Sequence, residues 1–532
     1  MKNTLAFIFA VTIALAVGIY VGSKVHSSGF SDIFSNSNKK KDKLNKLIDF
    51  IDQEYIDAIN TDSIVDVTVN NILEKLDPHS VYITKEEMTR VTENMQGDFV
   101  GVGINFYNYK DTITVIRAIE NGPSYKEGIL AGDRILMAGK DTLYGKNITN
   151  KFVLNRLKGA EGTTVALEVY RRSENKKIRV LVQRGVVPIK SVPAYYMMRP
   201  DLGYIKITRF AASTYTEFKQ ALTKLQKRGA KKLILDLRDN PGGYLNVAEQ
   251  IADEFLGDGK LILFTKNKSG KIEKTMASAK GSFENKPIYV LINERSASAS
   301  EVIAGALQDN DIGTIVGRRS FGKGLVQREM DLGDGSAVRL TVARYYTPTG
   351  RSIQKDYTKG TVDYYKRFTE RYHSGELVSV DSIKVADSLK FVTPKGKIVY
   401  GGGGVIPDIF VPIGTNEEET IRSMQRSGYL SYFIFEHLDE DRNAYNQYTR
   451  NEFIEDFKVD DILFQNFIDY AIKNRLRMDF YAHEKIIKAH LKAALSEQLF
   501  GANMYAQLKG LVDPMLTKVR ALNDFEISNS SN

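Results

Sequence analysis

Cysteine and tryptophan are absent from this 532-residue chain, and histidine occurs only six times. Without cysteine the chain has no disulfide, no thiol nucleophile and no thiolate metal site, although its compartment stays open. The histidines form no His-Glu-x-x-His pair, so nothing supports a zinc protease. We therefore expect no metal site.

A concentrated patch of one charge is also missing. The net charge is +9, from 74 basic and 65 acidic residues, and the basic ones are spread along the chain apart from a short run at 39–43. A nucleic-acid-binding protein is expected to show a basic face with a recognisable module, and neither is present. The apolar fraction of 42% is normal for a globular protein, and the length predicts several folded domains.

A long apolar run does occur, at the N-terminus. After Lys2, residues 4–22 carry no charge. Nineteen helical residues span ~28 Å, close to the ~30 Å hydrocarbon core of a bilayer. We expect residues 1–26 to be a transmembrane anchor or a secretory signal, and favour the uncleaved anchor because Ala-Leu-Ala at 14–16 lies inside the apolar run. Either alternative predicts a protein of the cell envelope, on the periplasmic side of the inner membrane.

The rest of the chain divides by composition and hydrophobic period. The predicted regions are a Ser-, Asn- and Gly-rich linker at 27–38, a helical region at 39–95, a β-rich unit at 96–187, a core of alternating strands and helices at 188–413, and a helical domain at 414–532. Such alternation is typical of a βαβ layered core. The predicted fold class is therefore α/β multidomain, with a polar, tyrosine-rich insertion in the core at 355–400.

A serine-rich segment, Ser-Ala-Ser-Ala-Ser-Glu at 296–301, follows the apolar strand 288–292 and opens a predicted helix. A serine at such a turn presents its hydroxyl beside unpaired backbone N–H groups, which suit an anionic tetrahedral intermediate. Ser298 and Glu301 also fit a capping box, and a helix cap needs no further function. Taken alone, the segment is more typical of a cap.

A lysine between two glycines, in Phe-Gly-Lys-Gly at 321–324, changes that interpretation. Lysine acts as a general base only when neutral, and lowering its pKa from ~10.4 to about 7.5 costs ~4 kcal/mol. Apolar neighbours such as Phe321, Leu325 and Val326 supply the desolvation in this hypothesis. Gln327 lies four residues after Lys323, a spacing that places both on one face of a strand, where the amide can orient the amine. A solvated surface turn is the simpler alternative.

With these motifs together, the chain resembles the C-terminal processing peptidases, also called tail-specific proteases, over roughly residues 65–412. The resemblance implies that Ser298 is the nucleophile, that Lys323, 25 residues later, is the catalytic lysine, and that Gln327 positions it. It also implies a crotonase/ClpP-like protease core, and a reaction that requires no metal or organic cofactor.

Further segments extend the resemblance. Leu-Asp-Leu-Arg-Asp-Asn-Pro-Gly-Gly at 235–243 matches the family's strand-and-turn signature, although alone it is an ordinary turn. By resemblance, the backbone N–H of Gly242 or Gly243 and that of Ala299 form the oxyanion hole. The segments 77–80, 344–353 and 405–408 also look like family segments. The last two usually lie close together, so the intervening insertion leaves the walls of the substrate channel undefined.

The β-rich unit resembles a PDZ domain. Phe-Val-Gly-Val-Gly-Ile at 99–104 is similar to a carboxylate-binding loop, and Gly-Ile-Leu-Ala-Gly-Asp-Arg-Ile at 128–135 to the second PDZ signature. In this interpretation successive loop N–H groups bind a terminal carboxylate while the peptide adds a strand beside the loop. The predicted tail-binding residues are Val100, Gly101, Val102, Gly103 and Ile104.

The sequence therefore predicts an envelope serine endopeptidase that recognises C-terminal tails of polypeptides and cleaves through an acyl-enzyme. A histidine-based triad is not expected, because the histidines are few and lie outside the matched segments. Two alternatives remain open. One is a catalytically silent PDZ-containing scaffold of the envelope; the other is a crotonase-like acyl-CoA enzyme, which gives no reason for a PDZ domain.

The helical regions near the two ends of the chain are candidates for binding partners other than polypeptide substrates and the membrane. The stretch 39–76 resembles a dimerisation element of the family, so a homodimer or higher oligomer is one interpretation and packing within a monomer is the other. The region after 414 has three alternative roles, which are binding an adaptor protein, binding a second subunit, and capping the core.

Overall fold

The computed structural model describes residues 39–530, so the predicted anchor at 1–26 and linker at 27–38 lie outside the described residues. Within 39–530, no helix combines the length and apolar character needed to cross a bilayer. The chain separates into two compact units, Met1–Leu76 and Asp77–Asn532. In the first, the described helices are α3 (Lys39–Glu54) and α4 (Thr61–Glu74), and α4 begins at Asn60, whose side chain accepts the Ser63 N–H at 3.1 Å.

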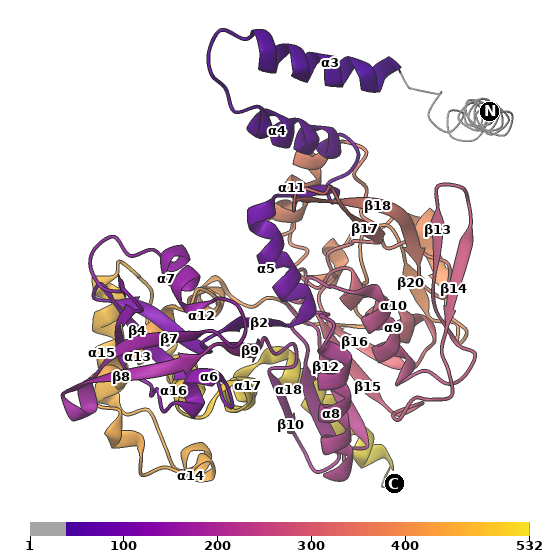
Figure 1. Cartoon of the computed structure of the whole chain (residues 1–532). Helices are drawn as coiled ribbons and strands as arrows, with labels where there is room; N and C mark the ends of the chain where they lie inside the picture. The colour runs from indigo at the N-terminus through magenta and orange to yellow at the C-terminus, as the bar shows by residue number, and fades with distance from the viewer. Residues whose placement is uncertain (1–38, 531–532) are drawn as a thin grey trace, which may run out of the picture. The chain divides into compact units, whose positions relative to one another are not determined.

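The centre of the second unit is a six-stranded sheet in the order β10-β11-β12-β15-β16-β21, parallel except for β10 (Figure 1). Its strands are Ala194–Met197, Leu202–Lys206, Lys232–Asp236, Ile288–Ile292, Gly313–Gly317 and Ile409–Phe410. Three helices follow its strands, namely α8 (Thr214–Lys227), α9 (Leu245–Asp253) and α10 (Ala299–Asp309). This arrangement confirms the predicted α/β class with its βαβ layers.

Apolar side chains of other elements cover both faces of this sheet. For this reason its strands are continuous apolar runs in the sequence. Leu233 and Leu235 of β12 pack with helices α8, α9 and α10, whereas Ile234 between them faces the opposite cluster. That second cluster contains Met515 and Leu516 of helix α18 (Pro514–Ser530). The end of the chain therefore caps the core, which is one of the three roles considered for the C-terminal region.

A second, antiparallel sheet of the core has the order β1-β18-β13-β14, with β17 also paired to β18. Its strands are Val81–Ile83, Ala337–Tyr346, Leu261–Asn267, Ile272–Met276 and, for β17, Leu325–Asp331. Strand β1 comes from the segment that precedes the PDZ-like unit. Its pairing with β18 brings the residues just before it, 77–80, to the core. Helix α5 (Lys85–Gln96) follows and ends at Gly97 with φ +95°.

The PDZ-like unit is a six-stranded sheet in the order β3-β4-β5-β7-β8, with β6 paired to β5. Its elements are β3 Ile104–Tyr109, β4 Thr112–Ala118, α6 Pro123–Lys126, β5 Arg134–Ala138, β6 Asp141–Thr142, α7 Asn150–Leu157, β7 Thr164–Arg171 and β8 Lys176–Gln183. A ribbon of β2 (Asp98–Gly101) and β9 (Gly185–Pro188) leads into and out of it. The unit has its own apolar core, to which Val153 and Leu157 of α7 contribute.

The insertion and the C-terminal region supply the remaining elements. Within the insertion lie α11 (Thr361–Glu370) and a hairpin of β19 (Lys390–Val392) and β20 (Ile398–Tyr400). The C-terminal helices before α18 are α12 Asn416–Arg426, α13 Tyr429–Glu440, α14 Arg450–Glu455, α15 Asp461–Lys473, α16 Glu484–Phe500 and α17 Ala502–Lys509. They enclose a separate apolar core rich in phenylalanine.

Candidate active site

Ser298 stands at the junction between the strand-side loop and helix α10, with φ +55° and ψ −116°. A non-glycine residue rarely adopts a positive φ, and such strain persists only where the surroundings impose it. The other capping-box residues of this chain are ordinary by comparison, since Thr84, Thr415 and Thr449 have φ between −67° and −71°. A helix cap alone needs no such backbone, so this conformation distinguishes Ser298 from the other three caps.

A glycine turn lies directly against this serine. An added Cβ at Gly242, where φ is +105°, would be 2.7 Å from the Ser298 Cβ, and one at Gly243, where φ is +147°, would be 2.2 Å from the Phe210 carbonyl oxygen. Only glycine fits such close approaches with positive φ. The Gly242 N–H donates to the Asn240 Oδ1 at 2.9 Å. Within residues 39–530, by contrast, the N–H groups of Gly243 and Ala299 donate no hydrogen bond.

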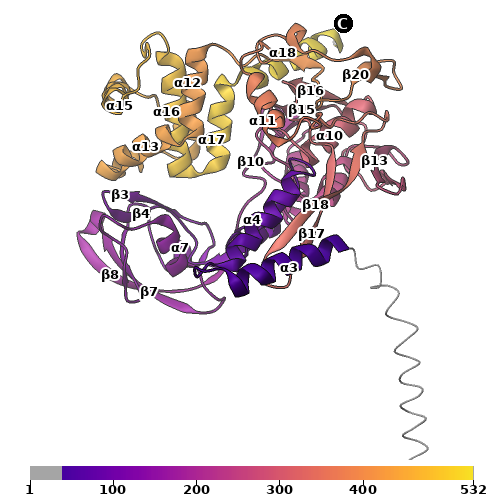
Figure 2. The ribbon, with the colours of Figure 1, turned by 90° about the horizontal axis from the view of Figure 1, so that it is seen from above.

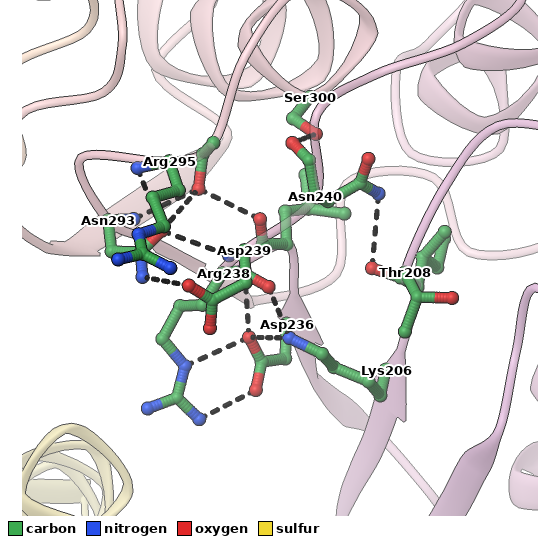
Figure 3. A network of polar contacts seen from close by, with 12 residues as sticks. Lys206, Thr208, Asp236, Arg238, Asp239, Asn240, Asn293, Arg295 and Ser300 are labelled. Carbon is green, nitrogen blue, oxygen red and sulfur yellow. Dashed lines mark hydrogen bonds and ion pairs between the residues drawn. The ribbon is translucent and has the colours of Figure 1, made fainter. Parts of the chain in front are cut away.

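Asn240 ties the glycine turn to the serine segment (Figure 3). Its carbonyl oxygen accepts the Ala297 N–H at 3.0 Å and the Ser300 hydroxyl at 3.0 Å, while its amide donates to the Ile207 carbonyl oxygen. The glycine turn and the serine segment are thus held at a fixed separation.

An ion cluster supports the same turn from behind. Figure 3 shows Lys206 and Arg238 converging on the buried Asp236. Burial alone would raise the pKa of Asp236, but the two cations hold it well below its usual range. Asp239 directly follows Arg238 in the chain. Its carboxylate accepts from the Asn293 amide and its backbone N–H donates to the Asn293 Oδ1, both at 3.0 Å.

Glu301 joins the serine segment to the lysine segment. Its side chain is fully buried. One carboxylate oxygen accepts the N–H groups of Ser298 at 2.9 Å and Lys323 at 2.8 Å. The other accepts the Gly322 N–H at 2.7 Å and the Ser320 hydroxyl. The capping-box pattern predicted only the bond between the Ser298 N–H and Glu301. The sequence did not reveal that Glu301 also holds the loop that carries Lys323.

Tyr345 of β18 makes a second bridge. Its buried hydroxyl lies 2.8 Å from the Lys323 carbonyl oxygen and 3.2 Å from that of Ser298. Tyr345 was noticed in the sequence only as part of a family-like segment, because its contact to Ser298 spans 47 residues. Two side chains therefore hold the main chains of Ser298 and Lys323 together.

The amine of Lys323 donates to the Gln327 Oε1 at 2.8 Å, as the four-residue spacing predicted. Gln327 belongs to β17, at a register shift after Val326, whereas Lys323 lies just before that strand. Within the described residues the amine has no hydrogen bond to Ser298. Burial, with the positive charge of Arg339 adding to it, lowers the pKa of Lys323 to about 8, although Asp77 and Glu301 act in the opposite direction.

One histidine, His79, lies beside this site, although the segments that carry Ser298 and Lys323 contain none. The His79 carbonyl oxygen accepts from the Gln327 amide, and its ring Nε2 lies 2.9 Å from the Tyr364 hydroxyl. Burial and the neighbouring Lys323 lower the pKa of His79 to about 3. Sequence distance hid this contact, because the chain leaves the core after 77–80, forms the PDZ-like unit and returns. No cluster of three or more His, Asp or Glu able to hold a metal occurs in the described chain.

The predicted tail-binding residues fall into two groups. Val100 and Gly101 belong to β2, paired with Val186 and Gly185 of β9. Val102 and Gly103 form the turn into β3, which Ile104 opens. Strand β3 is at the edge of its sheet, and no strand of the described chain pairs with its outer side. An incoming peptide strand therefore has a free edge beside this turn.

Helix α13 packs against the PDZ-like unit, as Figure 2 shows for α13, β3 and β4. Tyr107 and Tyr109 of β3 meet Phe435 with ring centroids 5.2 Å apart in both pairs. Nearby, the buried Asp439 pairs with Arg134 at 2.6 Å and Arg172 at 2.9 Å. The C-terminal helices thus contact the PDZ-like unit as well as the core.

A cavity of about 390 Å³ lies between the C-terminal helices and the back of the ion cluster. Its walls include Arg238 and Asp513, which pair at 2.6 Å. Neither Ser298 nor Lys323 lines it. The cavity is therefore separate from the cluster that contains Ser298, Glu301 and Lys323.

Comparisons with known proteins agree with this geometry. Residues 201–364 match Peptidase family S41, and residues 100–182 match the PDZ domain. A carboxy-terminal-processing protease of Bartonella bacilliformis is 33% identical over 323 residues, which are 60% of this chain and 74% of that protein. The chain belongs to peptidase family S41. It is a serine-type peptidase with a PDZ domain, as predicted.

Other matches extend over more of the chain. The carboxy-terminal processing protease CtpA of Bacillus subtilis is 32% identical over 405 residues, 73% of this chain and 85% of that protein. A solved structure described as photosystem II D1 C-terminal processing protease is 25% identical, covers 70% of this chain and 86% of its own, and has a TM-score of 0.36. Residues 420–501 match a family of unknown function, DUF8443, so the C-terminal helices have counterparts that sequence reading did not identify.

Proposed function

We propose that this S41 peptidase cleaves polypeptides with Ser298 as nucleophile and Lys323 as general base. The observation that carries the proposal is the shared carboxylate of Glu301, which holds the N–H groups of Ser298 and Lys323 at 2.9 and 2.8 Å. The lowered pKa of Lys323, about 8, supports it, because roughly a tenth of the amine is then neutral at pH 7.

In the proposed reaction Lys323 accepts the Ser298 proton as the serine oxygen attacks the scissile carbonyl. The free N–H groups of Gly243 and Ala299 stabilise the oxyanion, and each such donor is worth roughly 10²–10³ in rate. Gly242 contributes close approach instead, since its N–H is occupied by Asn240. The lysine then protonates the leaving amine, and water hydrolyses the acyl-enzyme.

The test of the pair uses Ser298→Ala and Lys323→Ala with an unfolded reporter protein. We expect both variants to lose cleavage while Ser269→Ala and Lys271→Ala, which change exposed residues of a β-hairpin, stay active. Equal cleavage by wild type and by the Ser298 and Lys323 variants would reject the pair. Peptide binding without cleavage by the wild type would instead indicate a scaffold.

We also propose that the PDZ domain selects substrates by their C-terminal carboxylate. The free edge of β3 and the turn at Val102 and Gly103 support this, since a bound tail can add a strand there. Two reporters of identical sequence, one with a free C-terminal carboxylate and one with an amide, isolate the charge. We expect the amide to raise KM at least tenfold, and equal KM values would reject carboxylate capture.

The proposed location is the cell envelope, with the peptidase outside the cytoplasm. The uncharged run at 4–22 supports it. Carbonate extraction of membranes from cells that express the full chain or a chain lacking 1–26 tests the anchor. We expect only the full chain to stay in the membrane pellet, and recovery of both in the soluble fraction would reject anchoring.

A further inference from the structure

The insertion at 355–400 forms several hydrogen bonds with the loop that carries Lys323. The Lys355 N–H donates to the Gly322 carbonyl oxygen at 2.9 Å. Arg371, which is buried, donates to the carbonyl oxygens of Ser320 at 2.9 Å and Arg319 at 2.6 Å. The insertion therefore holds the segment that leads into Lys323.

Helix α11 of the insertion also holds the segment before the PDZ domain. The Tyr364 hydroxyl lies 2.9 Å from the His79 Nε2, and the Tyr365 hydroxyl donates to the Pro78 carbonyl oxygen at 3.1 Å. The His79 ring packs edge-on against Tyr364, with centroids 5.2 Å apart, and against Phe321 at 6.3 Å. Two hydroxyls and two rings thus fix the position of His79.

The position of His79 determines the orientation of Gln327. The His79 carbonyl oxygen accepts from the Gln327 amide nitrogen, and a carbonyl can only accept. The amide oxygen of Gln327 must therefore point the other way, where it accepts the Lys323 N–H at 2.8 Å. A neutral amine that donates one N–H to this oxygen keeps its lone pair free for the proton of a serine hydroxyl.

We propose that Tyr364 and Tyr365 are positioning residues for the general base, acting through His79 and Gln327 on Lys323. The inference rests on the proposed Ser298–Lys323 pair and deepens it. It gives the insertion a role in the reaction, whereas the sequence indicated only that the insertion affects the walls of the substrate channel.

Aromatic rings around this relay also keep water out. Phe321, Tyr364 and Phe368 surround the Lys355 amine, whose nitrogen lies 4.7, 3.8 and 5.7 Å from the three centroids. Burial is the largest cause of the lowered pKa of both Lys355 and His79. Removing one of these rings exposes the surroundings of Lys323 to water, and this raises the pKa of Lys323.

The charges that face Lys323 come from other elements. They are Arg339 of β18, Asp77 of the segment before β1, and Glu301 of α10. None of them contacts Tyr364 or Tyr365 through a hydrogen bond in the described chain. Asp77 also accepts the His79 N–H at 2.8 Å, so a change in the pH profile of a variant at either tyrosine reports on the relay, its cover and the segment 77–80 that the tyrosines hold.

The experiment measures kcat, KM and the pH profile of kcat/KM for three variants. For Tyr364→Phe combined with Tyr365→Phe, which removes both hydroxyls and keeps the rings, we expect kcat to fall about tenfold or more with KM unchanged. For Tyr364→Ala, which opens the cover, we expect the acidic limb to move up by about one pH unit. The control is Tyr372→Phe, in the same insertion, which removes a hydroxyl 3.5 Å from Glu294 and keeps the ring that packs on Phe368.

The outcomes separate this inference from the proposed function. Lys323→Ala is measured beside the tyrosine variants, and circular dichroism checks that each variant is folded. If Lys323→Ala keeps wild-type activity, the catalytic pair is rejected. If Lys323→Ala is inactive but the tyrosine variants match Tyr372→Phe in kcat and acidic limb, only the relay is rejected. A folded Tyr364→Ala with an unshifted limb also counts against the relay.

Discussion

Replacing Glu301 by glutamine tests the scaffold of the site with almost no change in shape. The carboxylate accepts four hydrogen bonds, two on each oxygen, from Ser298, Lys323, Gly322 and Ser320. Burial raises the pKa of Glu301, and the four donors oppose that rise. A glutamine has one acceptor oxygen and a donor amide, so it cannot satisfy all four partners.

The orientation that the glutamine adopts sets the size of the effect. Turning its nitrogen toward Ser320 is favoured, because a hydroxyl can rotate and accept. The Gly322 N–H then has no acceptor, which costs about 1–3 kcal/mol for a buried donor. The bonds to Ser298 and Lys323 persist but lose their charge assistance, which roughly halves their strength. We expect a total loss of about 2–4 kcal/mol in the free energy of unfolding of the core.

The assay follows urea denaturation of Glu301→Gln by circular dichroism and measures kcat on the unfolded reporter. We expect a lower denaturation midpoint and a kcat at least tenfold below wild type. Glu249→Gln is the matched control, since Glu249 accepts one hydrogen bond, from Thr275 at 3.0 Å, which a glutamine oxygen also accepts. A Glu301 variant with the midpoint and kcat of this control would refute the argument that the carboxylate holds the site.

Three further predictions use the same preparation. Because Lys323 must be neutral to accept a proton and its pKa is about 8, kcat/KM should rise with pH through about pH 8. Lys323→Arg should be inactive, since a guanidinium stays charged. A flat pH profile of the wild type between about pH 6 and pH 9 would contradict this. Gly242→Ala should lower kcat about a hundredfold, because its Cβ would lie 2.7 Å from that of Ser298, and an unchanged kcat would remove the argument for close approach. Asp439→Ala, which leaves two arginines of the PDZ domain without their carboxylate, should speed limited proteolysis around 188–193, and equal digestion would show that the ion pairs do not hold the domain.

Local sequence signals were sufficient for the core elements. The apolar run of β15 and the helix that opens at the serine-rich segment were predicted from the sequence, because burial on both faces of a parallel sheet leaves a continuous apolar run. The bond between Lys323 and Gln327 was also readable, since four residues separate them. In each case the physical cause lies within one short segment.

The long-range contacts of the site were not readable. Tyr364 meets His79 across 285 residues, because the PDZ domain and most of the core intervene between them. The tyrosine-rich composition of the insertion was visible, but nothing local indicates which hydroxyl meets which partner. Likewise, the positive φ of Ser298 depends on the glycine turn beside it, so the capping pattern of the segment could not predict this conformation.

The carboxylates near Lys323 explain how an amine can be deprotonated here at all. Glu301 is saturated by four donors, and Asp77 accepts the N–H groups of His79 and Ser80 as well as the Ser80 hydroxyl. Within the described chain neither forms an ion pair with Lys323. A paired lysine keeps its proton, because the ion pair favours the charged form. In this site the negative charges stabilise the main chain instead, and among residues 39–530 a neutral amide is the only acceptor in hydrogen-bond contact with the amine.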